Sequence, residues 1–185
     1  MTELFIFRTA LRDFLRFRRL WIWIGLALVA FMIAGAWRAD GASSQEVYSQ
    51  LVEGMVFKVV ALSSAIFTTS IVSNEVEQRT ISYLLTRPIE RWRLLLSRFF
   101  ASALTVALVG IASVIAVAAA AFQGSLDTGQ IAKDVAAIIF VALGYGGLFL
   151  FISLIVNRAM IVCLLFAFAW ETAIPNMPGE VYYLS

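Results

Sequence analysis

Long apolar segments alternate with short polar ones along the whole chain. The apolar segments cover about residues 20–37, 51–73, 94–122, 131–156 and 159–174. An α-helix rises ~1.5 Å per residue, so roughly 18 to 25 residues cross the ~30 Å of hydrocarbon in a bilayer. The segments are apolar or small on every face, whereas barrel strands alternate apolar and polar residues. The pattern predicts an all-α membrane protein with five visible transmembrane helices, in a transmembrane domain covering residues 20–175.

The segments outside these helices are polar. Within residues 1–19, Phe7 and Leu11 group against Arg8 and Arg12, which predicts an amphipathic helix at the cytoplasmic membrane interface. Residues 38–50 are predicted to form a short loop on the far side of the membrane.

The C-terminal end of the fifth apolar segment carries helix-breaking residues. Pro175 follows it, and Pro178 and Gly179 indicate non-helical backbone. The sequence thus stops in what resembles the middle of an element, and we expect the native chain to continue beyond Ser185.

Positive charge is distributed unevenly about the apolar segments. Arginines at 8, 12, 16, 18, 19, 79, 87, 91, 93, 98 and 158 fall on the N-terminal side of the membrane, whereas Arg38 and Lys133 flank the other side. Basic residues favour the cytoplasmic side. We therefore predict a multi-pass protein of a bacterial cytoplasmic (inner) membrane with a cytoplasmic N-terminus.

Composition removes several classes of function. The chain of 185 residues is 62% hydrophobic and 14% charged, with a formal net charge of +2, one cysteine and no histidine. A lone Cys163 supports neither a disulfide framework nor a thiolate cluster, and the missing histidine removes the commonest zinc and haem ligand. We expect no metal site, no cofactor within this chain, and no binding of nucleic acid.

The most densely charged internal segment, residues 74–93, carries the one recognisable motif. Acidic, threonine, paired leucine, proline and arginine positions follow one another at fixed spacing, namely Glu75, Glu77, Thr80, Leu84, Leu85, Pro88, Ile89 and Arg91. This stretch resembles the segment that joins the second and third spans of type-2 ABC transporter permeases. Arg79 stands where that family usually has glycine, and Ser97 and Arg98 replace its common Gly-Lys or Ala-Lys.

The resemblance implies a coupling helix that docks on a cytoplasmic motor. Leu84, Leu85 and Ile89 suit an apolar groove, while Pro88 ends the helix. Charge-assisted contacts would come from Glu75, Glu77, Arg87 and Arg91. Arg79 and Thr80 are further expected coupling residues. The simpler interpretation is that these charges only solvate a loop and orient the protein.

The resemblance also implies the function: the membrane-spanning permease of an ATP-driven exporter. The chain lacks a G-x-x-x-x-G-K-[ST] phosphate loop, so ATP and Mg are expected on a partner ATPase subunit, and the chain itself is not an enzyme. A second permease copy, most simply a homodimer, and membrane lipids complete the expected partners. Similar permeases have six spans, so residues 176–185 are expected to begin an extracytoplasmic re-entrant region before a sixth.

Three polar or aromatic residues within the apolar segments are candidates for the transport pathway: Lys58, Trp170 and Glu171. Ionisable groups at membrane depth usually face a cavity, a partner or an interface. Alternatively, Lys58 snorkels or pairs with an acid, and Glu171 reaches water at the outer boundary. Glu53 lies near the outer end of the second segment.

Other classes of membrane protein compete with the permease. A non-transporting scaffold that anchors a cytoplasmic complex would use the same helices but would not need the motif at 74–93. An intramembrane enzyme would need clustered catalytic residues, and a channel or secondary transporter would need several intramembrane acids or broken helices in repeated halves. The substrate stays open among lipids, glycans, drugs, peptides and ions.

Overall fold

The computed structural model describes residues 17–41, 43–77, 91–122, 128–156 and 158–173. These residues are helical, and no strand occurs among them. The elements are α2 (Phe17–Ala39), α3 (Ser44–Leu51), the π-helix η1 (Val52–Val56), α4 (Phe57–Glu77), α6 (Arg91–Phe122), α7 (Thr128–Ile155) and α8 (Ala159–Ala173). The predicted all-α class is confirmed.

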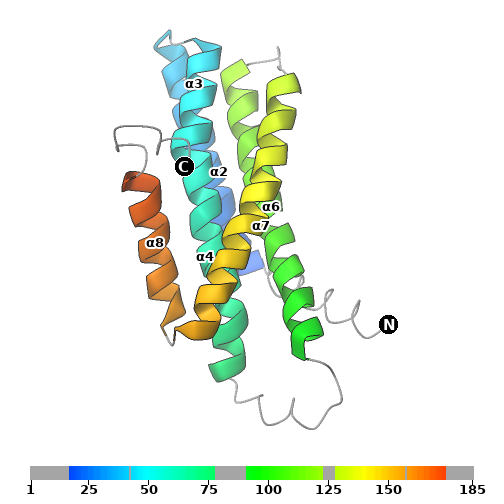
Figure 1. The fold of residues 1–185 in the computed structure, drawn as a ribbon. Helices are drawn as coiled ribbons and strands as arrows, with labels where there is room; N and C mark the ends of the chain where they lie inside the picture. Colours follow the sequence, from blue (N-terminus) through cyan, green and yellow to red (C-terminus); the bar gives the residue numbers. More distant parts are fainter. Residues whose placement is uncertain (1–16, 42, 78–90, 123–127, 157, 174–185) are drawn as a thin grey trace.

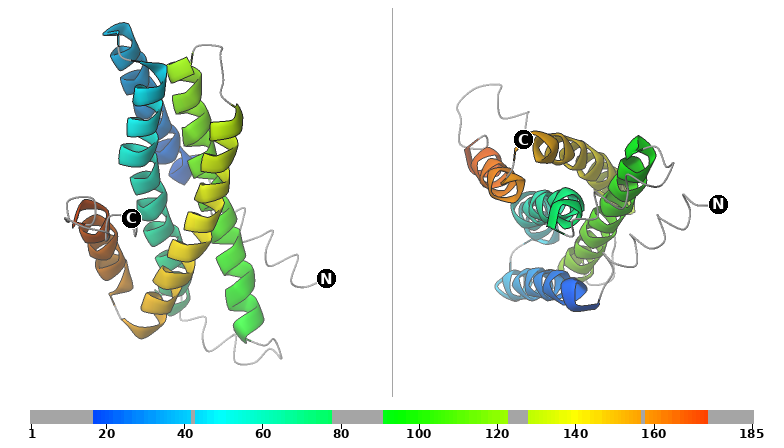
Figure 2. Two further views of the ribbon diagram at one scale, coloured as in Figure 1. Left: turned by 45° about the horizontal axis from the view of Figure 1, so that its top comes forward. Right: turned by 90° about the horizontal axis from the view of Figure 1, so that it is seen from below.

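The helices form an elongated bundle around α4 (Figure 1). α3, η1 and α4 follow one another end to end as a single long rod, which packs against α6, α7 and α8. α2 lies along α6, on the side of the bundle away from α8, as the end-on view in Figure 2 shows. α4 therefore contacts α6, α7 and α8 and joins α8 to the rest of the bundle together with α7.

The α4 rod and α6 run antiparallel in a constant register. Near one end, the rings of Tyr48 and Phe122 lie with their centroids 5.2 Å apart. Twelve residues further along each helix, Val60 lies against Gly110, where an added Cβ would stand 2.8 Å from the valine Cγ2. Because the two contacts are equally spaced on both helices, the pair packs side by side without slipping.

The expected loop at 38–50 is wrong in its second half. Residues from Ser44 onward form α3, whose Val47, Tyr48 and Leu51 are buried. Ser43 caps this helix by accepting a hydrogen bond from the backbone N–H of Glu46 at 3.3 Å, and a serine followed three residues later by glutamate is a capping-box pattern. Because the segment is polar overall, the prediction from sequence overlooked this N-terminal cap and the apolar side of the helix.

The lengths of the helices suit a bilayer. Three are long and apolar enough to cross one, at Ser44–Ile71, Leu95–Phe122 and Thr128–Ile155, and shorter apolar helices cover Trp23–Ala39 and Ala159–Trp170. The five predicted apolar segments thus all coincide with helices. The count of spans and a sixth helix stay predictions.

The outward faces are as apolar as the core. Phe140 is 76% exposed, Ile155 67% and Phe151 66%, whereas the interior consists largely of alanine and valine. Soluble monomers rarely leave such continuous apolar surface in water. Lipid or another protein must therefore cover these faces.

Candidate functional site

Lys58 lies on the face of α4 that meets α8. Ala61 and Ala65 of α4 are fully buried and pack with Cys163 and Ala167 of α8. Lys58 precedes the two alanines by three and seven residues, and residues at these spacings share one face of a helix. Its side chain is only partly buried, so α8 does not cover it as it covers the alanines.

Trp170 lies beyond the buried contact between α4 and α8, at the same end of it as Lys58. α4 and α8 run in opposite directions (Figure 1), and Ala61, Ala65, Cys163 and Ala167 form their buried contact. Lys58 precedes this contact on α4 and Trp170 follows it on α8. Two of the three predicted pathway residues thus lie at one end of the α4–α8 contact.

An aromatic ladder fixes the angle between α7 and α8. Tyr145 stacks on Phe149 with centroids 5.4 Å apart, Phe149 meets Phe166 edge-on at 6.3 Å, and Phe166 stacks on Trp170 at 5.4 Å. Phe149 is fully buried, whereas Tyr145, Phe166 and Trp170 are partly exposed. Aromatic contacts of this kind are worth about 0.5–1.5 kcal/mol each beyond their buried area.

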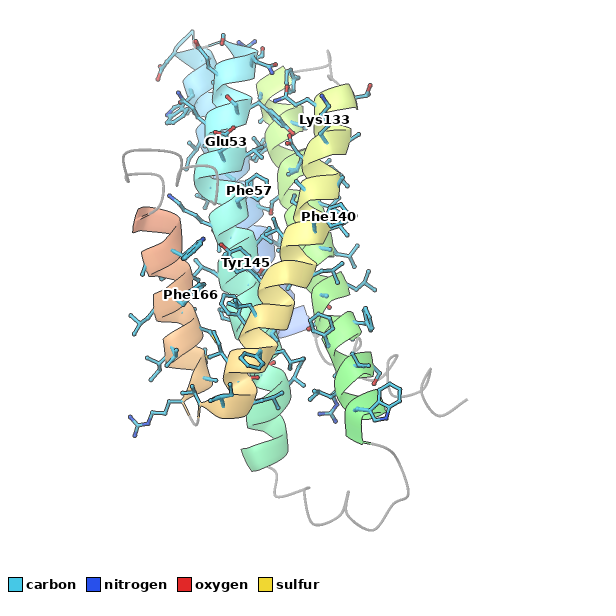
Figure 3. The ribbon with its side chains drawn as sticks, in the orientation of Figure 1. Glu53, Phe57, Lys133, Phe140, Tyr145 and Phe166 are labelled. Carbon is cyan, nitrogen blue, oxygen red and sulfur yellow. The ribbon has the colours of Figure 1, made fainter. Side chains whose placement is uncertain are left out.

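Tyr145 of α7 packs on the same cluster as Ala61. The next residue, Gly146, lies beside Ser64 of α4, where an added Cβ would stand 3.8 Å from the serine Oγ, so Tyr145 is nearer the level of Ser64 than that of Lys58. The residues Glu53, Phe57 and Tyr145 lie on one visible side of the bundle, with Phe166 of α8 beside them (Figure 3). Sequence reasoning missed Tyr145, because a single tyrosine within an apolar segment reads as ordinary packing.

The structure describes only some of the other predicted site residues. Glu171 follows Trp170 in α8, but its side chain lies outside the described residues. Glu75 and Glu77 belong to the last turns of α4, and Arg91 begins α6. The other predicted coupling residues lie outside the described residues, namely Arg79, Thr80, Leu84, Leu85, Arg87, Pro88 and Ile89. The same holds for residues 1–16 of the predicted interface helix and for residues 176–185.

A polar contact joins α3 to the start of α7 at the end of the bundle opposite Glu77. The hydroxyl of the buried Tyr48 donates a 2.6 Å hydrogen bond to Oδ2 of Asp134. Beside it, Nε2 of Gln45 donates to Oε1 of Gln130. These polar side chains identify one boundary of the apolar part of the bundle.

The interior hydroxyls do not form a polar path. Most donate to a carbonyl three or four residues earlier in their own helix, as Ser63, Thr69, Ser102, Thr105, Ser113 and Ser153 do. Ser64 is the exception: it is fully buried and its Oγ has no hydrogen-bond partner among the described residues. An ideal Cβ on Gly146 of α7 would stand 3.8 Å from that oxygen.

Comparison with known families adds the last observation. A family model described as ABC-2 family transporter protein matches residues 13–182, nearly the whole chain. The chain belongs to the ABC-2 transporter membrane family. The comparison with curated proteins finds no match, and neither does the comparison with solved structures.

Membership of the ABC-2 family agrees with the resemblance carried by residues 75–91. Members are membrane subunits of ABC transporters, so the chain is a permease subunit and a multi-pass membrane protein. Such subunits normally pair with ATPase subunits. The helices described above are thus those of a transport subunit.

Proposed function

We propose that this ABC-2 permease is the membrane half of an exporter and works as a dimer driven by two cytoplasmic ATPase subunits. The family match over residues 13–182 carries the proposal. A non-transporting scaffold would not need this match, which extends through all the helices rather than one cytoplasmic motif.

The packing of α4 and α6 supports a coupling role for the segment between them. α4 ends at Glu77 and α6 begins at Arg91, at the same end of the bundle (Figure 1). Since the two helices keep one register between the Val60–Gly110 contact and the Tyr48–Phe122 contact, a push on residues 78–90 would move them together. The movement would then reach the opposite end of the bundle with little rearrangement of the side chains between the two helices.

The proposed cycle follows from this stiffness. ATP binding brings the ATPase subunits together, their motion tilts the coupling segments of both permease copies, and the α4–α6 pairs change the path between them. Hydrolysis restores the first state. The N-terminus and the 78–90 segment are cytoplasmic in this proposal, in a bacterial inner membrane.

Co-expression with the ATPase encoded beside the permease tests the proposal. We expect the two proteins to co-purify in nanodiscs and to hydrolyse ATP, and a Glu77→Arg, Arg91→Glu variant to lose binding or stimulation. The matched control reverses charges at the other end of the bundle, as Asp40→Arg and Lys133→Glu, and should keep both. If no ATPase binds the wild-type permease, the exporter proposal fails and the scaffold replaces it.

A further inference from the structure

α7 changes its packing partners in the middle of its length. It begins beside α6 and ends beside α8 (Figure 1). Up to Ala142, its buried side chains belong to the hydrophobic cluster that includes residues of α2, η1 and α6, as Ile138 does. From Tyr145 onward they belong to a second cluster, in which Phe149 packs with residues of α4 and α8. One helix therefore connects two separately packed parts of the bundle.

Three glycines lie where the partners change, namely Gly144, Gly146 and Gly147. In the interior of a helix, glycine is about fivefold less favourable than alanine. Packing accounts for Gly146, where an added Cβ would stand 3.1 Å from Cε2 of Phe99. At Gly144 and Gly147, no described atom lies within 4 Å of an added Cβ. These two glycines therefore weaken α7 although the described residues leave room for a side chain.

A buried hydroxyl without a partner faces this weak point. Ser64 of α4 is fully buried, and its Oγ has no hydrogen-bond partner among the described residues. An ideal Cβ on Gly146 would stand 3.8 Å from that oxygen. A buried, unsatisfied hydroxyl is costly, and alanine would fill the same place without that cost. Ser64 is therefore suited to a second state, in which a hydrogen-bond acceptor comes within its reach.

Opening of α7 at the glycines would create such an acceptor. In the intact α-helix, the N–H of Gly146 bonds to the carbonyl of Ala142, and both residues are buried. Where glycine breaks a membrane helix, hydroxyls of neighbouring helices and local 3₁₀ or π turns satisfy the freed backbone groups. We propose that α7 bends at Gly144–Gly147 during transport, and that Ser64 then donates a hydrogen bond to the freed carbonyl of Ala142.

The bend moves α8 together with the last part of α7. Phe149 meets Phe166 edge-on with ring centroids 6.3 Å apart, and the thiol of Cys163 donates to the Phe149 carbonyl oxygen at 3.9 Å. Both contacts lie on the α8 side of the glycines. The eight residues from Gly147 to Ile155 form a lever of about 12 Å. A bend of about 20° therefore displaces its end by about 4 Å.

This inference rests on the proposed function for the force that bends α7, but the bend can be measured with and without the ATPase. Spin labels are attached to exposed positions in the two parts of the bundle, at Leu96→Cys in α6 and Met160→Cys in α8, with Cys163→Ala as the background. Double electron–electron resonance gives the distance distribution of the labels. It is measured on the permease alone in nanodiscs and on its complex with the ATPase, trapped by ATP and vanadate. Melting temperatures are recorded for the same proteins.

The first variant strengthens α7 without disturbing its packing. Gly144→Ala combined with Gly147→Ala should reduce the ratio of bent to straight α7 about thirtyfold, which is the product of two fivefold helix preferences. It should not lower the melting temperature. The matched control combines Gly25→Ala with Gly35→Ala in α2, where no described atom lies within 4 Å of an added Cβ either. The control should leave the distance distribution unchanged.

The second variant removes the hydrogen-bond donor. Ser64→Ala should reduce the ratio of bent to straight α7 about tenfold, because the freed carbonyl of Ala142 is left unsatisfied. It should keep or raise the melting temperature. Ser63→Ala is the matched control, since that serine is equally buried but its hydroxyl already donates to the carbonyl of Val60 in its own helix. If Ser64 only filled space, Ser64→Ala would leave the ratio unchanged, as the control should.

The expected result for the wild type is a second label distance that ATP and vanadate favour. A single, unchanged distance in a complex that hydrolyses ATP overturns this inference alone. So does a second distance that either the glycine variant or Ser64→Ala leaves unaffected. If no ATPase binds, but the permease alone shows two distances that these variants redistribute, the proposed function is overturned alone. A single distance without bound ATPase overturns both.

Discussion

Gly110 has closer neighbours than any other glycine that the structure describes. A Cβ added there would stand 2.7 Å from Cγ2 of Ile138 and 2.8 Å from Cγ2 of Val60. Real Cβ atoms are almost never found that close to another heavy atom, and both neighbours are fully buried, β-branched side chains that have little freedom at χ1. Gly110→Ala must therefore push α6 away from α4 and α7.

The size of the effect follows from two opposing contributions. Overpacking a well-packed interior costs about 1–3 kcal/mol, and alanine gains about 1 kcal/mol over glycine in a helix. Gly144→Ala is the matched control, because that glycine is exposed on α7 with no atom within 4 Å of an added Cβ. Gly144→Ala therefore gains the helix propensity of alanine without overpacking, so the free energies of unfolding of the two variants should differ by about 2 kcal/mol.

Thermal stability in detergent measures this difference. For a chain of this size, 2 kcal/mol corresponds to about 4–8 °C in melting temperature, with Gly110→Ala the lower of the two. Adding Val60→Ala removes one of the clashing methyl groups, so the double variant should lose less than the sum of the single losses. Equal melting temperatures for Gly110→Ala and Gly144→Ala would refute the close packing of α4, α6 and α7.

Four further substitutions test other parts of the structure. Tyr48→Phe should destabilise the protein by about 1–3 kcal/mol, since it leaves Asp134 without its 2.6 Å hydrogen bond; melting in detergent checks this, and no change would exclude a structural role for the bond. Ser64→Ala should keep or raise the melting temperature because the buried hydroxyl has no partner among the described residues, and a clear loss would reveal one. In a chain otherwise free of cysteine, Asp40→Cys should react with an impermeant maleimide on intact cells and Arg158→Cys only after permeabilisation; the reverse result would invert the topology.

The long helices could be predicted because the bilayer makes a simple demand on sequence. A backbone in hydrocarbon must satisfy its own hydrogen bonds, so an unbroken apolar run of spanning length has little choice but helix. The five apolar segments and α2, α4, α6, α7 and α8 agree for that reason. The prediction failed at α3, which lies in a polar region of the sequence. A helix there is determined by an N-terminal cap and one apolar side rather than by total hydropathy.

The site was only partly predictable for a different reason. Lys58 and Trp170 stood out because charge and interfacial aromatics are unusual in apolar runs. Nothing in the sequence indicated that Tyr145 would pack on the buried contact between α4 and α8, since that depends on the register of α7 against α4. The π-helix η1 likewise left no local signal beyond Gly54 within the run.

The three contacts of α4 differ in how firmly they hold it, and this difference bears on mechanism. Toward α6 and α7, the close approach of Val60 and Ile138 to Gly110 means that branched side chains interlock, so movement there requires repacking. Toward α8, the buried contacts are Ala61, Ala65, Ala167 and Cys163, and such small side chains interdigitate little. A load applied where α4 ends would therefore move α4 with α6 and the part of α7 around Ile138 as one body. α8, which holds α4 less firmly, would follow through its ring contact with α7, where Phe149 meets Phe166 edge-on.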